Sequence, residues 1–304
     1  IAIILALGFF GCMVQSNSIG STIQMAFGIP SWIVGIFLVI ICGFIFMGGV
    51  DRLASVTEKL VPVMAAFFLI GGLGVLAMRL QYIPETFGLI FKYAFQPQAI
   101  IGGGFGIAIK TAVSQGAKRG LFSNEAGMGS TPHAHALALV KNPHEQGCVA
   151  MVGVFIDTFI VLTLNALVII STLYAGNGPL ANGYVGEAAN TLKNTNLAQV
   201  AFGVVYGDKA GAVFVAICLF FFAFSTILGW NLFAKINVTY LFGKKAQRPF
   251  MLVALVFIFL GTIGESDLVW ACSDMFNQLM VIPNAIALFA LTGVVTKMLG
   301  DRDK

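Results

Sequence analysis

Residues 211–234 read GAVFVAICLFFFAFSTILGWNLFA and contain no charged side chain. A helix of about 20 mostly apolar residues is long enough to cross the hydrocarbon core of a bilayer. Apolar runs of comparable character recur along the chain, at 1–14, 32–50, 60–78, 97–113, 149–173, 250–264 and 275–298. The sequence therefore predicts an all-α polytopic membrane protein with about eight transmembrane helices.

The overall composition agrees with a lipid environment. Hydrophobic residues make up 58% of the 304 positions and charged residues 10%, whereas a soluble domain has about 25% charged residues. The formal net charge is +4, without a basic stripe interleaved with aromatic residues, so we expect no nucleic-acid partner. The five cysteines have no metal-site spacing, and we expect no metal site built on them.

Lys and Arg concentrate in a few connections, and such connections tend to face the cytoplasm. The segments predicted to be cytoplasmic are 51–59, 141–146, 235–248 and the tail after 296. Those predicted to face outward are the turn 261–268 and the long connection 175–210, with an amphipathic segment at 82–95 along the outer interface. This alternation predicts a multi-pass protein of the plasma (inner) membrane.

The first apolar run begins at Ile1 and continues as a more polar helix to about Phe27. It lacks a charged leader region and a cleavage site, so it is not a signal peptide. We expect residues 1–304 to form a single transmembrane domain of an N-terminally truncated chain.

The segment from Gly116 to His135 is unusual for a membrane helix. Within it, GLFSNEAGMGSTP combines glycines, a proline and small polar residues around Glu125. Glycine and proline weaken a regular helix, and small polar side chains offer its backbone other hydrogen bonds. Interrupted helices of this kind bind substrates and ions near the midplane of transporters. The alternative is a simple cytoplasmic loop between two spans.

A second candidate lies in the apolar run at 211–234. Phe222, Thr226 and Trp230 recur every four residues and therefore share one helix face. Their ring, hydroxyl and indole N–H would suit a small zwitterion, and Ser225 could join Thr226 in binding sodium. The alternative is a packing seam whose hydroxyls bond to carbonyls one turn earlier.

Polar residues inside spans are the third group of candidates. Asp157 lies in the middle of the run at 149–173, and an intramembrane carboxylate is costly. We expect it to form a structural hydrogen-bond hub more readily than a substrate contact. Gln15 and Asn17 interrupt the first span, where interhelical contact is favoured over substrate contact.

Several of these segments resemble the alanine or glycine:cation symporter family. The similar words, in the family's order, are MVQSNS (13–18), RGLFSNEAGMGS (119–130), PHAH (132–135), FIDT (155–158), FAFSTILGW (222–230) and Pro283-Asn284. The resemblance implies a leucine-transporter-like inverted-repeat fold in which the chain starts at the third core helix. The interruption at Glu125–Ser130 would then lie in the sixth core helix and 222–230 in the eighth.

The resemblance also implies a function and a site. Gly129 and Ser130 would meet the substrate backbone, Thr226 and Trp230 would bound its side chain, and Ser225 with Thr226 would lie near sodium. The family's other interrupted helix has no counterpart in residues 1–304.

The sequence thus predicts a secondary active symporter for a small neutral amino acid, alanine or glycine, driven by sodium and without a cofactor. A proton-coupled permease of the same fold, with Asp157 or Glu125 as proton carrier, and a passive channel are the alternatives. We find no nucleophile or metal constellation typical of an enzyme.

Overall fold

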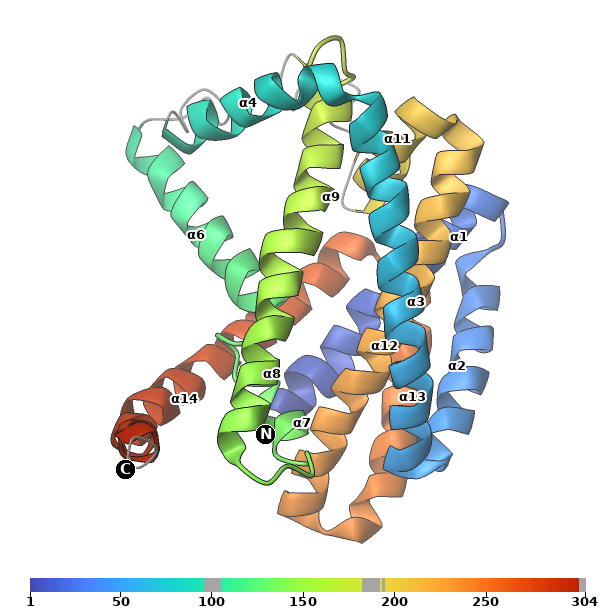
Figure 1. Cartoon of the computed structure of the whole chain (residues 1–304). Coiled ribbons are helices and arrows are strands. Elements are labelled where there is room, and N and C mark those ends of the chain that lie inside the picture. Colours follow the sequence, from blue (N-terminus) through green and yellow to red (C-terminus); the bar gives the residue numbers. More distant parts are fainter. Residues whose placement is uncertain (96–104, 182–191, 193–194, 301–304) are drawn as a thin grey trace.

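The computed structural model describes residues 1–95, 105–181, 192 and 195–300. In this part of the chain every regular element is a helix and no strand occurs (Figure 1). Helices long and apolar enough to cross a membrane are Ile4–Phe27, Arg52–Met78, Pro143–Tyr174, Asp208–Phe242, Lys244–Ile263 and Ser266–Met298. The prediction of an all-α polytopic membrane protein is confirmed.

The described helices follow one another along the chain in a fixed order. They are η1 (Ile4–Gly11), α1 (Cys12–Phe27), α2 (Ser31–Met47), α3 (Gly49–Met78), η2 (Leu80–Tyr82), α4 (Ile83–Phe95), α6 (Phe105–Ser123), α7 (Pro132–His135), α8 (Pro143–Phe155), η3 (Ile156–Val161), α9 (Leu162–Ile169), η4 (Ile170–Tyr174), α11 (Thr195–Tyr206), α12 (Asp208–Phe242), η5 (Lys244–Ala246), α13 (Gln247–Ile263) and α14 (Ser266–Gly300). The predicted run 32–50 corresponds to α2. The run 97–113 overlaps α6, and its first part lies outside the described residues.

Burial is inverted relative to a soluble protein. Large apolar side chains point outward, among them Phe289 with 84% of its surface exposed and Ile70 with 72%. Polar side chains such as Asn17, Ser130 and Asn231 are buried instead. Lipid can solvate the apolar exterior, whereas polar groups in a membrane need partners inside the protein. This pattern supports the assignment of the long helices as membrane spans.

Helix α12 lies at the centre of the packing. On one side it packs with η1, α1 and α13 through buried residues such as Leu7, Ile227 and Ile258. Its first turns pack with α3 and α11 around Phe202, in a cluster to which α9 also contributes. Because α12 belongs to both apolar clusters, the clusters are joined through one helix.

Three segments predicted as loops are largely helical. Residues 51–59 belong to α3, most of 235–248 belongs to α12 and α13, and α11 lies within 175–210, of which 182–191 and 193–194 are outside the described residues. The first two errors have one cause: charged side chains mark where a helix leaves the hydrocarbon, and the helix itself continues into water. Arg52, for example, is exposed on α3 and donates to the Phe44 carbonyl at 2.8 Å. A turn at Gly207, whose φ is 89°, separates α11 from α12, which begins at Asp208.

The connections fall at two ends of the molecule. The α2–α3 junction, the segment before α8 and the α12–α13 turn lie at the lower end in Figure 1. Helix α4 lies across the upper end, transverse to the long helices (Figure 1). The three connections predicted to be cytoplasmic therefore share one end.

Candidate functional site

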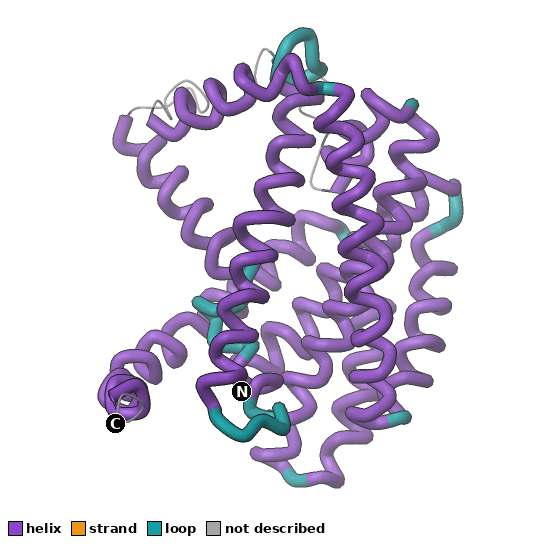
Figure 2. The backbone as a smooth tube through the Cα atoms, in the orientation of Figure 1, coloured by secondary structure: helices purple, strands orange, loops and turns teal. Residues whose placement is uncertain are grey.

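The helix predicted to be interrupted is interrupted. Helix α6 ends at Ser123, and after a non-helical stretch α7 forms a single turn, Pro132–His135. Figure 2 draws this stretch as loop among the long helices. We call residues 124–131 the unwound segment. Its local sequence explains the break: Gly129 has a φ of 70°, and the Asn124 side chain accepts from the Ala126 N–H at 3.1 Å. Both features compete with a regular helix.

The Glu125 carboxylate accepts two hydrogen bonds that fix the unwound segment. One carboxylate oxygen accepts from the Ser130 hydroxyl at 2.5 Å, across the turn of the segment itself. The other accepts from the indole N–H of Trp230 on α12. Ser130 and Trp230 are 0% and 3% exposed. Two residues predicted for one substrate site, far apart in sequence, are thus bonded to the same carboxylate.

The ring of Trp230 is packed between two other elements. Phe122, at the end of α6, meets it edge to face, with 5.7 Å between ring centroids. Gly11 in η1 lies so close that a Cβ atom there would come within 2.7 Å of the indole. Trp230 therefore joins η1, α12 and the end of α6.

The hydroxyls of Ser225 and Thr226 both donate to the Phe222 carbonyl at 2.9 Å. This bonding to a carbonyl one turn earlier is the pattern expected of a packing seam, which is the alternative to a ligand role. It uses the hydroxyl protons and leaves oxygen lone pairs available. Thr226 precedes Trp230 by one turn on the same face of α12.

Asp157 has a partner that sequence alone did not identify. The Ser123 hydroxyl, in the last residue of α6, donates to its carboxylate at 2.8 Å. Asn124 and Thr158 lie beside this pair, with 3.5 Å between the amide nitrogen and the hydroxyl oxygen. Asp157 belongs to the π-helical segment η3, a widening often found at functional sites. Asp157 thus binds the last residue of α6, and Glu125 binds Ser130 near the other end of the unwound segment.

The break lies at mid-depth in the bundle. Its partners Trp230, Asp157 and Asn284 are all close to the middle of a long helix: α12, the continuous helix from α8 to η4, and α14, respectively. A segment bonded to the centres of three spans is far from either membrane surface. This placement favours an interrupted helix over a simple cytoplasmic loop for the unwound segment.

The polar residues of α1 are separated from this cluster in part. Asn17 donates to the carbonyls of Gly261 and Gly264 at 2.9 Å each, which ties α1 to the end of α13. It therefore makes the favoured interhelical contact and is not joined to Glu125 or Asp157. Gln15 is half-buried and lies one turn beyond Gly11, the residue against Trp230.

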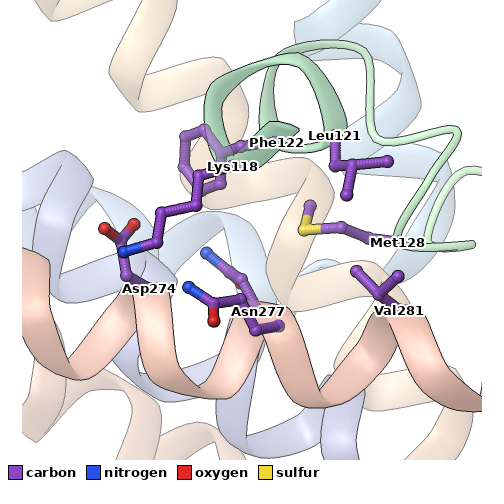
Figure 3. A pocket seen from close by; sticks show the side chains of 8 residues that line it. Lys118, Leu121, Phe122, Met128, Asp274, Asn277 and Val281 are labelled. Carbon is purple, nitrogen blue, oxygen red and sulfur yellow. The ribbon is translucent and has the colours of Figure 1, made fainter. Parts of the chain in front are cut away.

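Helix α14 also reaches the unwound segment, which sequence reasoning did not foresee. The Asn284 amide donates to the carbonyls of Ala126 at 3.1 Å and Gly127 at 2.9 Å. A signal was present in the sequence, because Asn284 follows Pro283 near the middle of a long helix. Figure 3 shows the neighbouring contact, in which Met128, Phe122 and Val281 surround a cavity of about 20 Å³.

Comparison with known proteins identifies relatives of this chain. The chain is 38% identical over 286 residues to the sodium/alanine symporter AgcS of Methanococcus maripaludis, covering 94% of this chain and 60% of that protein. It is 37% identical over 302 residues to a sodium/proton-dependent alanine carrier protein of Bacillus sp. PS3, covering 95% and 65%. An uncharacterized transporter of Haemophilus influenzae is 39% identical over 302 residues, covering 99% and 60%.

The chain thus spans about three fifths of the length of these relatives. The family model described as the sodium:alanine symporter family matches residues 1–304. Its members are transporters and not enzymes, and with the long apolar helices this identifies a multi-pass protein of the plasma membrane. The chain belongs to the sodium:alanine symporter family.

Proposed function

We propose that the full-length protein moves a small neutral amino acid, alanine or glycine, across the plasma membrane together with sodium. The observation that supports this most is the unwound segment bonded to Trp230 at mid-depth. Exposed backbone groups at such a break can bind the charged ends of an amino acid without a charged side chain. The names of the Methanococcus and Bacillus relatives point to alanine and sodium.

In this proposal Gly129 and Ser130 bind the backbone groups of the substrate. The Gly129 N–H donates to the Glu125 carbonyl at 3.0 Å, so it would exchange this internal hydrogen bond for one to the substrate. Ser130 lies beside it at the end of the unwound segment. Thr226 and Trp230 bound the substrate side chain. A wall made by an indole leaves room for a methyl group and little beyond it.

Sodium is proposed to bind near Ser225 and Thr226. Sodium is a hard cation and takes oxygen ligands, as Ca²⁺ and Mg²⁺ do. The Thr226 hydroxyl donates to the Phe222 carbonyl, and the Ser225 hydroxyl donates to this carbonyl or to the Met64 sulfur. The remaining lone pairs of both oxygens are therefore free to face a cation. A hydroxyl bonded in this way binds a cation without first losing a hydrogen bond.

We also propose the leucine-transporter-like inverted repeat with about eight spans and one domain over residues 1–304. The unwound segment between α6 and α7 would belong to the sixth core helix and α12 to the eighth. The continuity of the two apolar clusters through α12 supports a single domain.

Proton coupling is the second candidate. Glu125 and Asp157 both lie at the break, and no Lys or Arg is bonded to either of them in the described part of the chain. Uncompensated carboxylates inside a membrane are common proton carriers. The Bacillus relative, named as sodium/proton-dependent, is consistent with a proton as an alternative coupling ion.

Uptake by proteoliposomes that contain the full-length protein tests these alternatives. We expect labelled alanine or glycine to accumulate under an inward sodium gradient and not when potassium or choline replaces sodium. Accumulation driven by a pH gradient without sodium would favour the proton carrier. Equilibration without accumulation under either gradient would indicate a channel and contradict the symport proposal.

A further inference from the structure

Asn284 contacts two carbonyl groups in the middle of the unwound segment. The carbonyls of Ala126 and Gly127 lie where the helix is broken, and the Asn284 amide nitrogen donates to both, at 3.1 and 2.9 Å. Each such carbonyl is costly to leave unpaired inside a membrane. A single side chain on a distant helix therefore satisfies two consecutive groups of the broken backbone.

The same side chain also limits the end of the segment. At Gly129, whose φ is 70°, an added Cβ atom would come within 2.6 Å of Asn284 Cγ and 3.0 Å of its Cβ. The amide thus lies against the left-handed turn that directly precedes Ser130. Asn284 constrains both the carbonyls that enter the turn and the backbone that leaves it.

Helix α14 is itself fixed to α6 near this point. Arg119 forms two bonds with the Asp274 carboxylate, at 3.1 and 3.2 Å, and its guanidinium lies 4.9 Å from the centre of the Trp270 ring. Met128, which is 3% exposed, packs beside Val281 of α14 (Figure 3). Asn284 is therefore presented from a helix already held against the end of α6.

We propose that Asn284 is a positioning residue that fixes the course of the backbone from Met128 to Ser130. It acts through the segment and does not touch the substrate. This inference rests on the proposed function, because Gly129 and Ser130 are the residues proposed to bind the backbone groups of the substrate. Without Asn284 the segment samples other conformations, and the protein binds substrate more weakly while bound substrate still crosses.

The test compares Asn284→Ala and Asn284→Asp in the full-length protein with Thr292→Ala. Thr292 lies on α14 two turns further on and donates to the Leu288 carbonyl of its own helix, which makes it a matched control. We expect Asn284→Ala to raise the KM for alanine about tenfold or more, since two hydrogen bonds are lost, with Vmax within about a factor of two. Asn284→Asp has the same shape but places a carboxylate against two carbonyls, so its effect should be larger. Thr292→Ala should match the wild type.

Hydrogen–deuterium exchange of the purified protein gives a readout independent of transport. We expect Asn284→Ala to increase exchange at Met128–Ser130 and to leave α1 and α12 unchanged. Unchanged exchange in the segment would overturn the proposal, and so would an equal increase in all helices, which indicates a merely structural residue.

Two cases need a separate measurement: a variant that does not fold, and a wild type that shows no uptake. If Asn284→Ala does not fold, Asn284→Gln, which keeps the amide but displaces it by one methylene, must show the same local exchange and KM change, or the proposal fails. If the wild type shows no sodium-driven alanine uptake, the proposed function fails, whereas the exchange result still decides the role of Asn284.

Discussion

Glu125 has a backbone φ of 59°, in the left-handed region that residues other than glycine rarely adopt. Such a conformation costs on the order of 1–3 kcal/mol and persists where surrounding contacts determine it. Here the contacts are the bonds from Ser130 and Trp230 to its carboxylate. The strain at Glu125 is thus offset by the two side chains proposed to line the substrate site.

Trp230 is the residue whose replacement tests the shape of that site. We expect Trp230→Ala in the full-length protein to weaken alanine binding roughly tenfold, because the indole no longer contacts the methyl group. The variant should admit valine and leucine, because the space left by the indole accepts further methylenes, each of which changes binding by about 1–3 kcal/mol in an apolar pocket. Competition binding with the three amino acids measures the ranking. Trp230→Phe keeps a ring and should keep the ranking, although Glu125 loses a donor.

The control for this prediction is Trp32→Ala. Trp32 is on α2 and is 52% exposed, so its removal should change neither affinity nor ranking. An unchanged ranking in Trp230→Ala would mean that this indole joins helices and does not bound the substrate.

At the scale of elements, the bond between Ser123 and Asp157 joins the end of α6 to η3. We expect Ser123→Ala and Asp157→Ala to destabilise the protein, and the double variant to be no worse than the more damaging single one. A coupling free energy of about 1 kcal/mol is expected for one such bond in a membrane. Unfolding in mixed detergent measures it.

The matched control pairs Ser123→Ala with Thr57→Ala. Thr57 donates to the Leu53 carbonyl within α3, so the two changes should add. Sodium dependence should be the same in all folded variants if Asp157 is structural. A folded Asp157→Ala protein with altered ion dependence would assign the carboxylate to coupling instead.

The sequence predicted local features of these elements well and long-range ones poorly. The break after Ser123 was predictable because glycine, proline and small polar residues act on their own backbone. The bond from Asn284 to Ala126 joins residues 158 positions apart, and no local pattern specifies such a pairing. The segment 51–59 was predicted as a loop because charge marks the edge of the hydrocarbon and not the end of a helix.

At the scale of the molecule, the grouping of connections at two ends predicts a defined orientation. We expect a cysteine at Lys244 to react with an impermeant maleimide only in inside-out vesicles, and a cysteine at Asp208 only in right-side-out vesicles. The native cysteines are first replaced by serine or alanine, with uptake as a check of folding. Labelling of both positions from one side would contradict the predicted topology.

The order in which the chain is made adds a condition to its assembly. The unwound segment leaves the ribosome before its partners do, since Trp230 follows Glu125 by 105 residues and Asn284 follows Ala126 by 158. A break with open carbonyls is poorly tolerated by lipid until those partners arrive. We therefore expect the nascent segment to remain in water or beside the insertion machinery until these partners have been synthesised. Its entry into the bundle is a late event in biogenesis, completed after α14 has been synthesised.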